Sequence, residues 1–249
     1  MSAWRANPHI WLVTAAAIVV MGVTAALGLW QLGRASQKQR LQGHIAAQAL
    51  AAPLSAEELL GMPEQTAALH RPVRLRGHWL AGTELFLDNR PMGGRTGFVV
   101  LTALRLTNSE RAVLVQRGWV PRDFRVRDRL PLLSTPAGEV EVGGRLAPPP
   151  STLFELGSGA AGPIRQNVSL AALAAEWRIP LLDGVSVLQT DTDASGMARH
   201  WPVFVGDEHK HLAYAAQWFA LCAITAGLYL WFQILSPRSK RRPHGQHPR

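Results

Sequence analysis

The sequence predicts an α+β membrane protein in which two antiparallel transmembrane helices flank a mainly antiparallel β domain, a sheet or partial barrel, outside the cytoplasm. Three observations predict this class: two long apolar blocks, period-two alternation between them, and a basic cluster directly after the second block. The expected organisation is a cytoplasmic tail over 1–9, helices over 10–32 and 211–235, the β-rich domain over 33–210, and a basic cytoplasmic tail over 236–249.

The two apolar blocks account for a mean hydropathy of +0.03 and a hydrophobic content of 47%. Ile10 to Leu32 and Leu212 to Leu235 contain no charged residue, and each exceeds the roughly 20 residues that a helix needs to cross a bilayer. The first block is too long for the apolar core of a signal peptide, and no small-residue cleavage site follows it. We therefore expect both blocks to be retained as membrane anchors.

The net charge of +9 at first suggests a nucleic-acid partner, but its distribution argues against one. All 17 acidic residues lie between positions 34 and 210, so the central domain is nearly balanced. The excess positive charge stands beside the membrane, where it interacts with anionic lipid headgroups and fixes topology. The expected surface partner is membrane lipid, with no nucleic acid.

Topology follows from the positive-inside rule, which places the basic C-terminal tail in the cytoplasm and the domain across the membrane. Arg34, Lys38 and Arg40 after the first block argue for the reverse, but the asymmetry at the second block is steeper. A span that begins at residue 10 leaves little room for a transit peptide. We expect a multi-pass protein of the bacterial plasma (inner) membrane with a periplasmic domain; the alternative is the mitochondrial inner membrane.

The first half of the domain shows helix signals followed by strand signals. The first helix is expected to continue out of the membrane and end before Pro53, with a short helix over Ser55 to Leu60. Polarity alternates from Val73 to Trp79, and Ala81-Gly82 predicts a turn into a returning strand at Glu84 to Leu87. Two further apolar runs, Gly97 to Leu106 and Ala112 to Val120, predict a hairpin.

The second half contains fewer regular elements. A strand is expected over Glu139 to Leu146, ending before Pro148, and the Gly- and Ser-rich stretch from Leu156 to Pro163 predicts a mobile loop. Ser169 is expected to cap a helix over Leu170 to Trp177, followed by a strand over Val185 to Gln189.

Motifs for enzymatic chemistry are missing from the sequence. There is no nucleophile elbow, zinc-protease helix, phosphate-binding lysine loop or dinucleotide fingerprint, and the single cysteine, Cys222, lies in the second apolar block. The pair His209-x-His211 has metal-ligand spacing, but such spacing is common by chance. A hydrolase is an alternative with no positive feature in its favour. A two-span sensor is a further alternative, although the tail after Leu235 contains no signalling module.

One face of the second helix carries polar and aromatic side chains. At about 100° per residue, a single stripe contains His211, Tyr214, Trp218, Cys222, Thr225 and Tyr229. A neutral imidazole at the mouth of such a face suits the axial ligation of a haem iron, with aromatic rings beside the macrocycle. Two alternatives remain open: His211 is an ordinary interfacial polar residue, or the stripe packs on Gly22-x-x-x-Ala26 of the first helix.

Two arginines in the domain are candidates for binding anions. Arg90 follows Asp88-Asn89, and Arg117 precedes Gly118 and Trp119. Guanidinium groups bind carboxylates in bidentate fashion, such as a haem propionate or a partner's acidic side chain. The alternative is an arginine that pairs with an aspartate of its own fold, with Gly118 marking a bulge or bend.

Taken together, these pieces resemble the Surfeit locus protein 1 (Shy-type) family of cytochrome c oxidase assembly factors. The resembling segments occur in the family's order along almost the whole chain: Leu27 to Arg34 with Lys38; Arg71-Pro72-Val73 to Gly77; Asp88-Asn89-Arg90; Gly97 to Leu104; Val113 to Pro121 around Gln116-Arg117-Gly118-Trp119; and His211-Leu212-x-Tyr214 with Trp218-Phe219. The segment 136–185 resembles the family only weakly and stays unassigned.

The resemblance implies that the protein is not an enzyme and has a chaperone-like role in building the core subunit of cytochrome c oxidase, with that subunit and the haem a synthesis machinery as partners. It also implies binding of haem a, with His211 as the iron ligand and Tyr214, Trp218 and Trp30 as walls of the site. The alternative function is a haem-independent membrane scaffold that binds nascent oxidase subunits through Arg90, Arg117 and Trp119.

Overall fold

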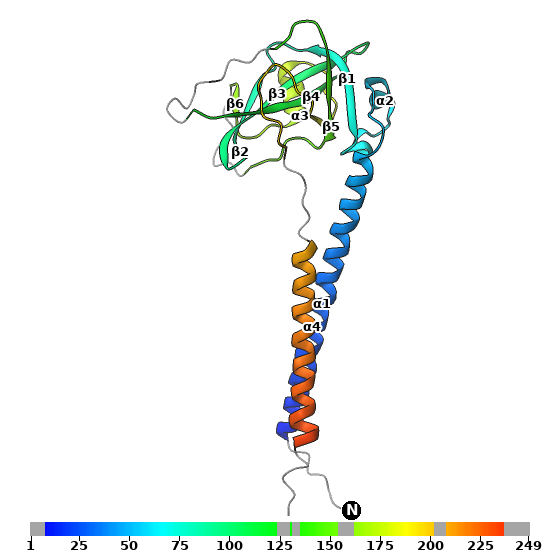
Figure 1. The fold of residues 1–249 in the computed structure, drawn as a ribbon, viewed down its shortest axis with the longest axis vertical. Coiled ribbons are helices and arrows are strands. Elements are labelled where there is room, and N and C mark those ends of the chain that lie inside the picture. Colours follow the sequence, from blue (N-terminus) through cyan, green and yellow to red (C-terminus); the bar gives the residue numbers. More distant parts are fainter. Residues whose placement is uncertain (1–7, 124–129, 131–134, 154–161, 202–207, 237–249) are drawn as a thin grey trace, which may run out of the picture. The chain divides into compact units, whose positions relative to one another are not determined.

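The computed structural model describes residues 8–123, 130, 135–153, 162–201 and 208–236 (Figure 1). The chain divides into two compact units. One contains Met1–Gln42 and Val205–Arg249, and the other contains Gly43–Phe204. They are called the helical unit and the β unit below.

The helical unit consists of two long helices. Helix α1 covers Pro8–Ala49, and its residues from Gly43 onward belong to the β unit. Helix α4 covers Glu208–Tyr229 and continues as the π-helix η2, Leu230–Leu235. Both helices are long and apolar enough to cross a membrane, and almost none of their apolar surface is buried within the protein. Hydrocarbon is the environment in which such side chains are stable. The two predicted membrane helices are thus confirmed as elements of the fold.

The two helices run antiparallel and touch along one face. At one end the Tyr229 hydroxyl lies 3.0 Å from Oγ1 of Thr14, and farther along Sγ of Cys222 donates to the Met21 carbonyl oxygen at 3.6 Å. The ring of Phe219 packs on Gly28, where an added Cβ would come within 2.8 Å of the ring carbons. Positions 14, 21 and 28 repeat every seven residues and so share one face of α1.

The predicted close approach at Gly22 is wrong. Nothing lies within 4 Å of the point that a Cβ at Gly22 would occupy. Gly22 is one residue beyond Met21, which turns it about 100° away from the face that meets α4. The small residue that admits an aromatic ring is Gly28 instead.

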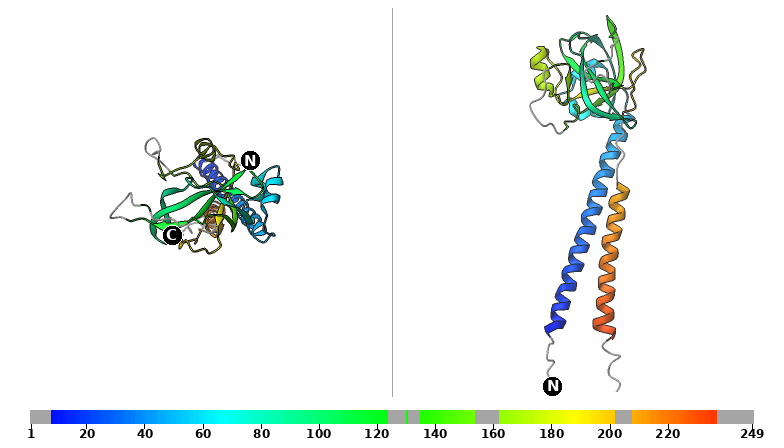
Figure 2. Two further views of the ribbon diagram at one scale, coloured as in Figure 1. Left: turned by 90° about the horizontal axis from the view of Figure 1, so that it is seen from above. Right: turned by 90° about the vertical axis from the view of Figure 1, so that its left-hand side faces the viewer.

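The β unit is built on a closed five-strand barrel, as far as the structure describes it. The strand order is β1-β5-β7-β4-β3, and pairing of β1 with β3 closes the ring; β2 and β6 continue outward from β3 (Figures 1 and 2). Pairing is antiparallel except for β4 with β7 and β2 with β6. The bounds are β1 Pro72–Trp79, β2 Leu85–Met92, β3 Arg95–Leu106, β4 Ala112–Pro121, β5 Glu139–Ala147, β6 Ile164–Arg165 and β7 Ser186–Gln189.

This barrel confirms the predicted class of a mainly antiparallel β domain. The predicted hairpin is the pair β3–β4, in register from Gly97 opposite Pro121 to Arg105 opposite Ala112. The expectation that the chain returns along β1 after Gly82 is wrong, because β1 pairs with β5 and β3 while β2 pairs with β3. Turn-forming residues indicate only that the chain changes direction. Which strand pairs with which depends on the apolar faces that are buried together.

Three short helices accompany the barrel: α2 (Ala56–Gly61), the 3₁₀ helix η1 (Gln65–Ala68) and α3 (Leu170–Trp177). Helix α2 confirms the prediction and begins with a capping box between Ser55 and Glu58. Helix α3 is also confirmed, but Ser169 at its N-cap makes no side-chain capping bond. Buried Leu170 and Leu173 hold α3 on the barrel instead. The predicted loop over Leu156–Pro163 lies largely outside the described residues.

Two β-bulges shape the strands that carry the candidate arginines. In β4, Gly118 faces Val100 and Gln116 faces Leu101, so Arg117 is the extra residue. In β2, the register shifts between Leu87 and Arg90. The predicted bulge at Gly118 is therefore confirmed, and its effect is to redirect the Arg117 side chain relative to the regular alternation of the strand.

Candidate functional site

The predicted iron ligand lies at the start of α4, where this helix faces α1. Nδ1 of His211 is 2.7 Å from Oε1 of Gln31. An amide oxygen only accepts hydrogen bonds, so in a neutral imidazole this contact corresponds to the tautomer with its proton on Nδ1 and a lone pair on Nε2. His211 is half-buried, and Gln31 is a residue whose role sequence reasoning missed, although it stands inside the segment Leu29-Trp30-Gln31.

The three aromatic residues predicted as walls of the haem site differ in how far they are exposed. Tyr214 and Trp30 are 53% and 54% exposed, and Trp218 is half-buried. The guanidinium carbon of Arg34 lies 5.7 Å from the centre of the Trp30 ring, which is a cation–π distance. Exposed aromatic rings on a membrane helix leave room for an apolar ligand or lipid to pack on them.

Three of the six residues in the polar stripe of α4 contact α1. His211, Cys222 and Tyr229 each contact a polar atom of α1, at Gln31, Met21 and Thr14 respectively. These three residues do pack on the first helix, but at Gln31, Met21 and Thr14 and not at the expected Gly22-x-x-x-Ala26. This packing leaves the other ring nitrogen, Nε2, available for a ligand, because the contact of His211 with Gln31 uses only Nδ1.

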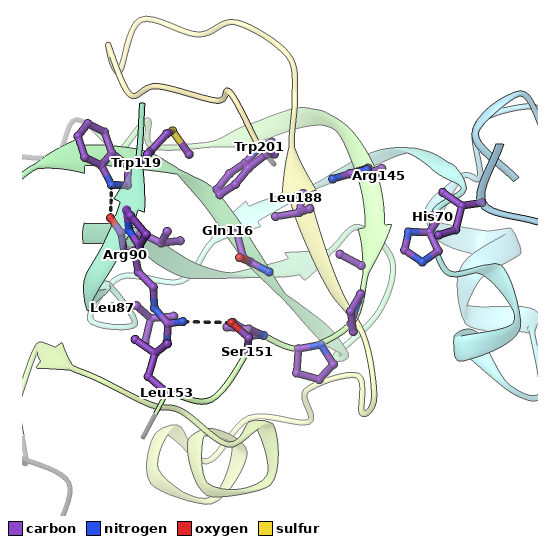
Figure 3. Close-up of a pocket in the computed structure, with 18 residues that line it drawn as sticks. His70, Leu87, Arg90, Gln116, Trp119, Arg145, Ser151, Leu153, Leu188 and Trp201 are labelled. Atoms are coloured by element: carbon purple, nitrogen blue, oxygen red, sulfur yellow. Dashed lines mark hydrogen bonds between the residues drawn. The ribbon is translucent and has the colours of Figure 1, made fainter. Parts of the chain in front are cut away.

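The β unit contains a cavity of about 500 Å³ (Figure 3). Arg90 and Trp119, predicted from sequence as partner-binding residues, meet in its wall: the indole Nε1 of Trp119 donates to the Arg90 carbonyl oxygen at 2.8 Å. Trp119 is only 6% exposed. Nη1 of Arg90 donates to Oγ of Ser151 at 3.2 Å and Nη2 donates to the Gln166 carbonyl oxygen at 2.7 Å.

Arg90 is held by neutral oxygens, since the neighbouring carboxylate is used elsewhere. Asp88 forms an ion pair with Arg122, with Nη1 to Oδ2 at 2.9 Å. Burial lowers the pKa of the Arg90 guanidinium, and its Nε has no hydrogen-bond partner among the described residues. The guanidinium nevertheless stays charged at neutral pH, because an arginine pKa begins above 12.

Arg117 lies in a different place and does not line this cavity. Its side chain is buried, with the guanidinium carbon 4.7 Å from the centre of the Trp79 ring and Nη1 donating to Oγ1 of Thr135 at 2.8 Å. Burial lowers its pKa, and the charges of Asp193 and Glu84 oppose that effect. Arg117 is thus an interior cation of the barrel wall.

Beside Arg117, the segment after β7 is fixed by Arg199. Nε of Arg199 donates to the Arg117 carbonyl oxygen at 2.7 Å, and Nη2 forms an ion pair with Oδ2 of Asp193 at 2.7 Å. Burial disfavours ionisation of Asp193, but hydrogen bonds from Arg199 and from the hydroxyl and amide of Ser195 outweigh it. They lower its pKa from 3.8 to about 2.

The lowered pKa of Asp193 predicts that its contribution to the stability of the fold decreases in acid. The folded-state pKa of Asp193 is below the unfolded value, so its contribution is complete above about pH 4 and is lost as the pH falls towards about 2. We expect Asp193→Asn to lower the urea midpoint at neutral pH and to lose less stability than the wild type between these two pH values. Equal pH dependence in the two proteins would contradict the assignment.

Three further residues of the cavity were missed by sequence reasoning: His70, Arg145 and Trp201. His70 has φ 73°, in the left-handed region, and its amide donates to the Leu146 carbonyl oxygen at 2.8 Å. Burial, together with the charges of Arg145 and His44, lowers the pKa of His70. No spacing in the sequence signals this group, because strands far apart along the chain bring it together.

Comparison with known proteins matches residues 18–223 to the model of the SURF1 family. The chain is 27% identical over 237 residues to Surfeit locus protein 1 of Mus musculus, covering 87% of this chain and 73% of the mouse protein. It is 28% identical over 245 residues to a SURF1-like protein of Drosophila melanogaster (89% and 77% covered). It is also 23% identical over 221 residues to one of Rickettsia prowazekii (85% of each). Along the chain, one apolar helix precedes the β barrel and another follows it. The family match extends from the first helix into the second, and the chain therefore belongs to the SURF1 family.

Proposed function

We propose that this protein assists the assembly of cytochrome c oxidase and holds haem a on its helix pair during maturation of the oxidase core subunit. Members of the SURF1 family are known as cytochrome oxidase assembly factors. The protein acts in the inner membrane of a bacterium, with its β unit on the periplasmic side. The core subunit and the haem a synthesis machinery are its partners.

The observation that carries the haem proposal is the hydrogen bond between His211 and Gln31. Histidines that bind metals almost always donate their second ring N–H to an oxygen, which fixes the tautomer and the ring orientation. Gln31 supplies that oxygen from the neighbouring helix. Nε2 of His211 is therefore the nitrogen that would bind iron.

The surroundings of His211 fit an apolar macrocycle. Trp30 and Tyr214 expose more than half of their surface, and Trp218 is half-buried on the same face of α4. Haem would supply an iron and a large apolar ring, and histidine is a common ligand of haem iron. Around it, His211 would hold the iron, Gln31 would keep the imidazole oriented, and the aromatic rings would shield the macrocycle from water.

The alternative is a haem-independent scaffold in which Arg90, Arg117 and Trp119 bind nascent oxidase. Arg117 and Trp119 are buried in this structure, which leaves little of either side chain for a partner to contact. This arrangement favours haem handling as the leading proposal. The partner-binding role of the three residues stays a prediction.

A deletion strain tests the proposal. Removal of the gene is expected to lower the amount of spectroscopically detectable haem a oxidase in the membranes, and expression of this chain restores it. The chain purified in mild detergent from cells that make haem a is expected to carry haem a. Failure to restore the oxidase would contradict the assembly role; restoration by a chain that never carries haem would contradict haem binding and favour the scaffold.

A further inference from the structure

The cavity of the β unit has properties that the haem proposal does not use. Its volume of about 500 Å³ lies in the range of sites that hold small organic molecules. Strands β2, β3, β4, β5 and β7 all contribute to its lining, so four strands of the barrel together with β2 form its wall. All of its lining residues belong to the β unit, and among the described residues no cluster of metal-ligating side chains is found there.

The charge of this cavity is one-sided. Arg90 and Arg145 both line it, and neither forms an ion pair with any residue that the structure describes. The guanidinium of Arg145 makes no side-chain hydrogen bond within the described part of the chain, and burial lowers the pKa of both arginines. Partly buried cations are normally paired with anions. Among the described residues, Arg90 and Arg145 have no anionic partner.

Most of the remaining wall is apolar, and two of its side chains are held in position by hydrogen bonds. The indole Nε1 of Trp201 donates to the Gln189 carbonyl oxygen at 2.6 Å, just as Trp119 donates to the Arg90 carbonyl oxygen. In Figure 3 the ring of Trp201 and the side chain of Leu188 lie between Arg90 on one side and Arg145 on the other. Side chains that are already held in position lose little conformational entropy when a ligand binds.

From this combination we infer that the cavity binds an amphipathic organic carboxylate, whose acid group pairs with Arg145 and whose apolar body packs on Trp201 and Leu188. Arginine binds both carboxylate and phosphate. The apolar wall favours a monoanionic carboxylate, because a phosphate carries more charge to desolvate. Arg90 is already engaged with Ser151 and Gln166, and it contributes its charge to the same cavity.

Calorimetric titration of the full chain in lipid nanodiscs tests this inference, with empty nanodiscs as the baseline. The probe is 1-pyrenebutyrate, and 1-pyrenebutanol has the same apolar body without the charge. We expect saturable binding of one pyrenebutyrate per chain, about tenfold or more tighter than pyrenebutanol, because hydrogen bonds to a charged group contribute that much. Acetate, which lacks the apolar body, is expected to bind more weakly than either.

Variants separate the cavity from general electrostatics. Arg145→Gln is expected to reduce the affinity for pyrenebutyrate to that for pyrenebutanol, and Arg145→Lys to retain part of the difference. Arg105→Gln removes the same charge from an exposed position outside the cavity and is expected to leave binding unchanged.

Three results would overturn the inference: equal binding of the acid and the alcohol to the wild type, no saturable binding above empty nanodiscs, or equal losses in the Arg145 and Arg105 variants. The first two need no variant, so they stand even where Arg145→Gln fails to fold. None of these results bears on haem binding at His211.

Discussion

His211→Ala is expected to yield a protein that folds and enters the membrane but no longer carries haem a. The substitution removes the imidazole whose Nε2 would bind iron, and an alanine cannot ligate iron. Alanine also favours the helix, so α4 remains intact. The measurement is the reduced absorption spectrum and the haem-to-protein ratio of the purified chain.

The matched control is His209→Ala, at the same end of α4 and two residues away, which places it about 200° around the helix. This variant is expected to retain haem at the wild-type ratio. Gln31→Leu is expected to weaken haem binding by about 10- to 100-fold, the usual cost of removing the partner that orients a metal-binding histidine. Retention of haem by His211→Ala, or equal losses in both histidine variants, would contradict the assignment.

Arg117→Ala is expected to cause the second large effect, a loss of about 3–5 kcal/mol in the free energy of unfolding of the β unit. The guanidinium is 1% exposed, packs on Trp79 and donates to Thr135. Truncation leaves a void beside the indole and removes the charge that faces Asp193 and Glu84. Urea unfolding followed by tryptophan fluorescence measures the change.

Arg105→Ala is the control, because it removes an exposed arginine from the neighbouring strand β3 and is expected to change stability by no more than about 0.5 kcal/mol. A change of similar size in both variants would contradict the interior role of Arg117. If the expected loss is observed, failure of oxidase assembly in Arg117→Ala follows from unfolding alone. A test of partner binding then needs a stably folded variant.

Local patterns in the sequence predicted the elements that depend on neighbouring residues. Two uncharged apolar blocks can only be stable in hydrocarbon or in a core, and the period-two alternation of Val73 to Trp79 reappears as the alternating burial of β1. The polar run between Leu106 and Ala112 predicted the β3–β4 hairpin, since the two strands are adjacent in sequence. The place of His211 on one helical face suggested it as an iron ligand, the family resemblance strengthened that interpretation, and the role stays a prediction.

Partners that are distant in sequence were beyond such reasoning. Gly28 rather than Gly22 receives an aromatic ring, because the antiparallel register of α1 and α4 decides which face of α1 is covered. Gln31 meets His211 across 180 positions of sequence. Arg145 and Trp201 join Arg90 in one cavity because the sheet places β5, β7, β4, β3 and β2 side by side, although β2, β5 and β7 are far apart in sequence.

The sequence by itself determined the two anchors, the β-rich domain between them and the histidine at the start of the second anchor, because hydrophobic periodicity is a local property of the chain. The tertiary structure alone decided strand order, the barrel's closure, the burial of Arg117 and the partner of His211. Each of these depends on which apolar surfaces exclude water together, a condition that is satisfied by the whole fold and not by any single segment.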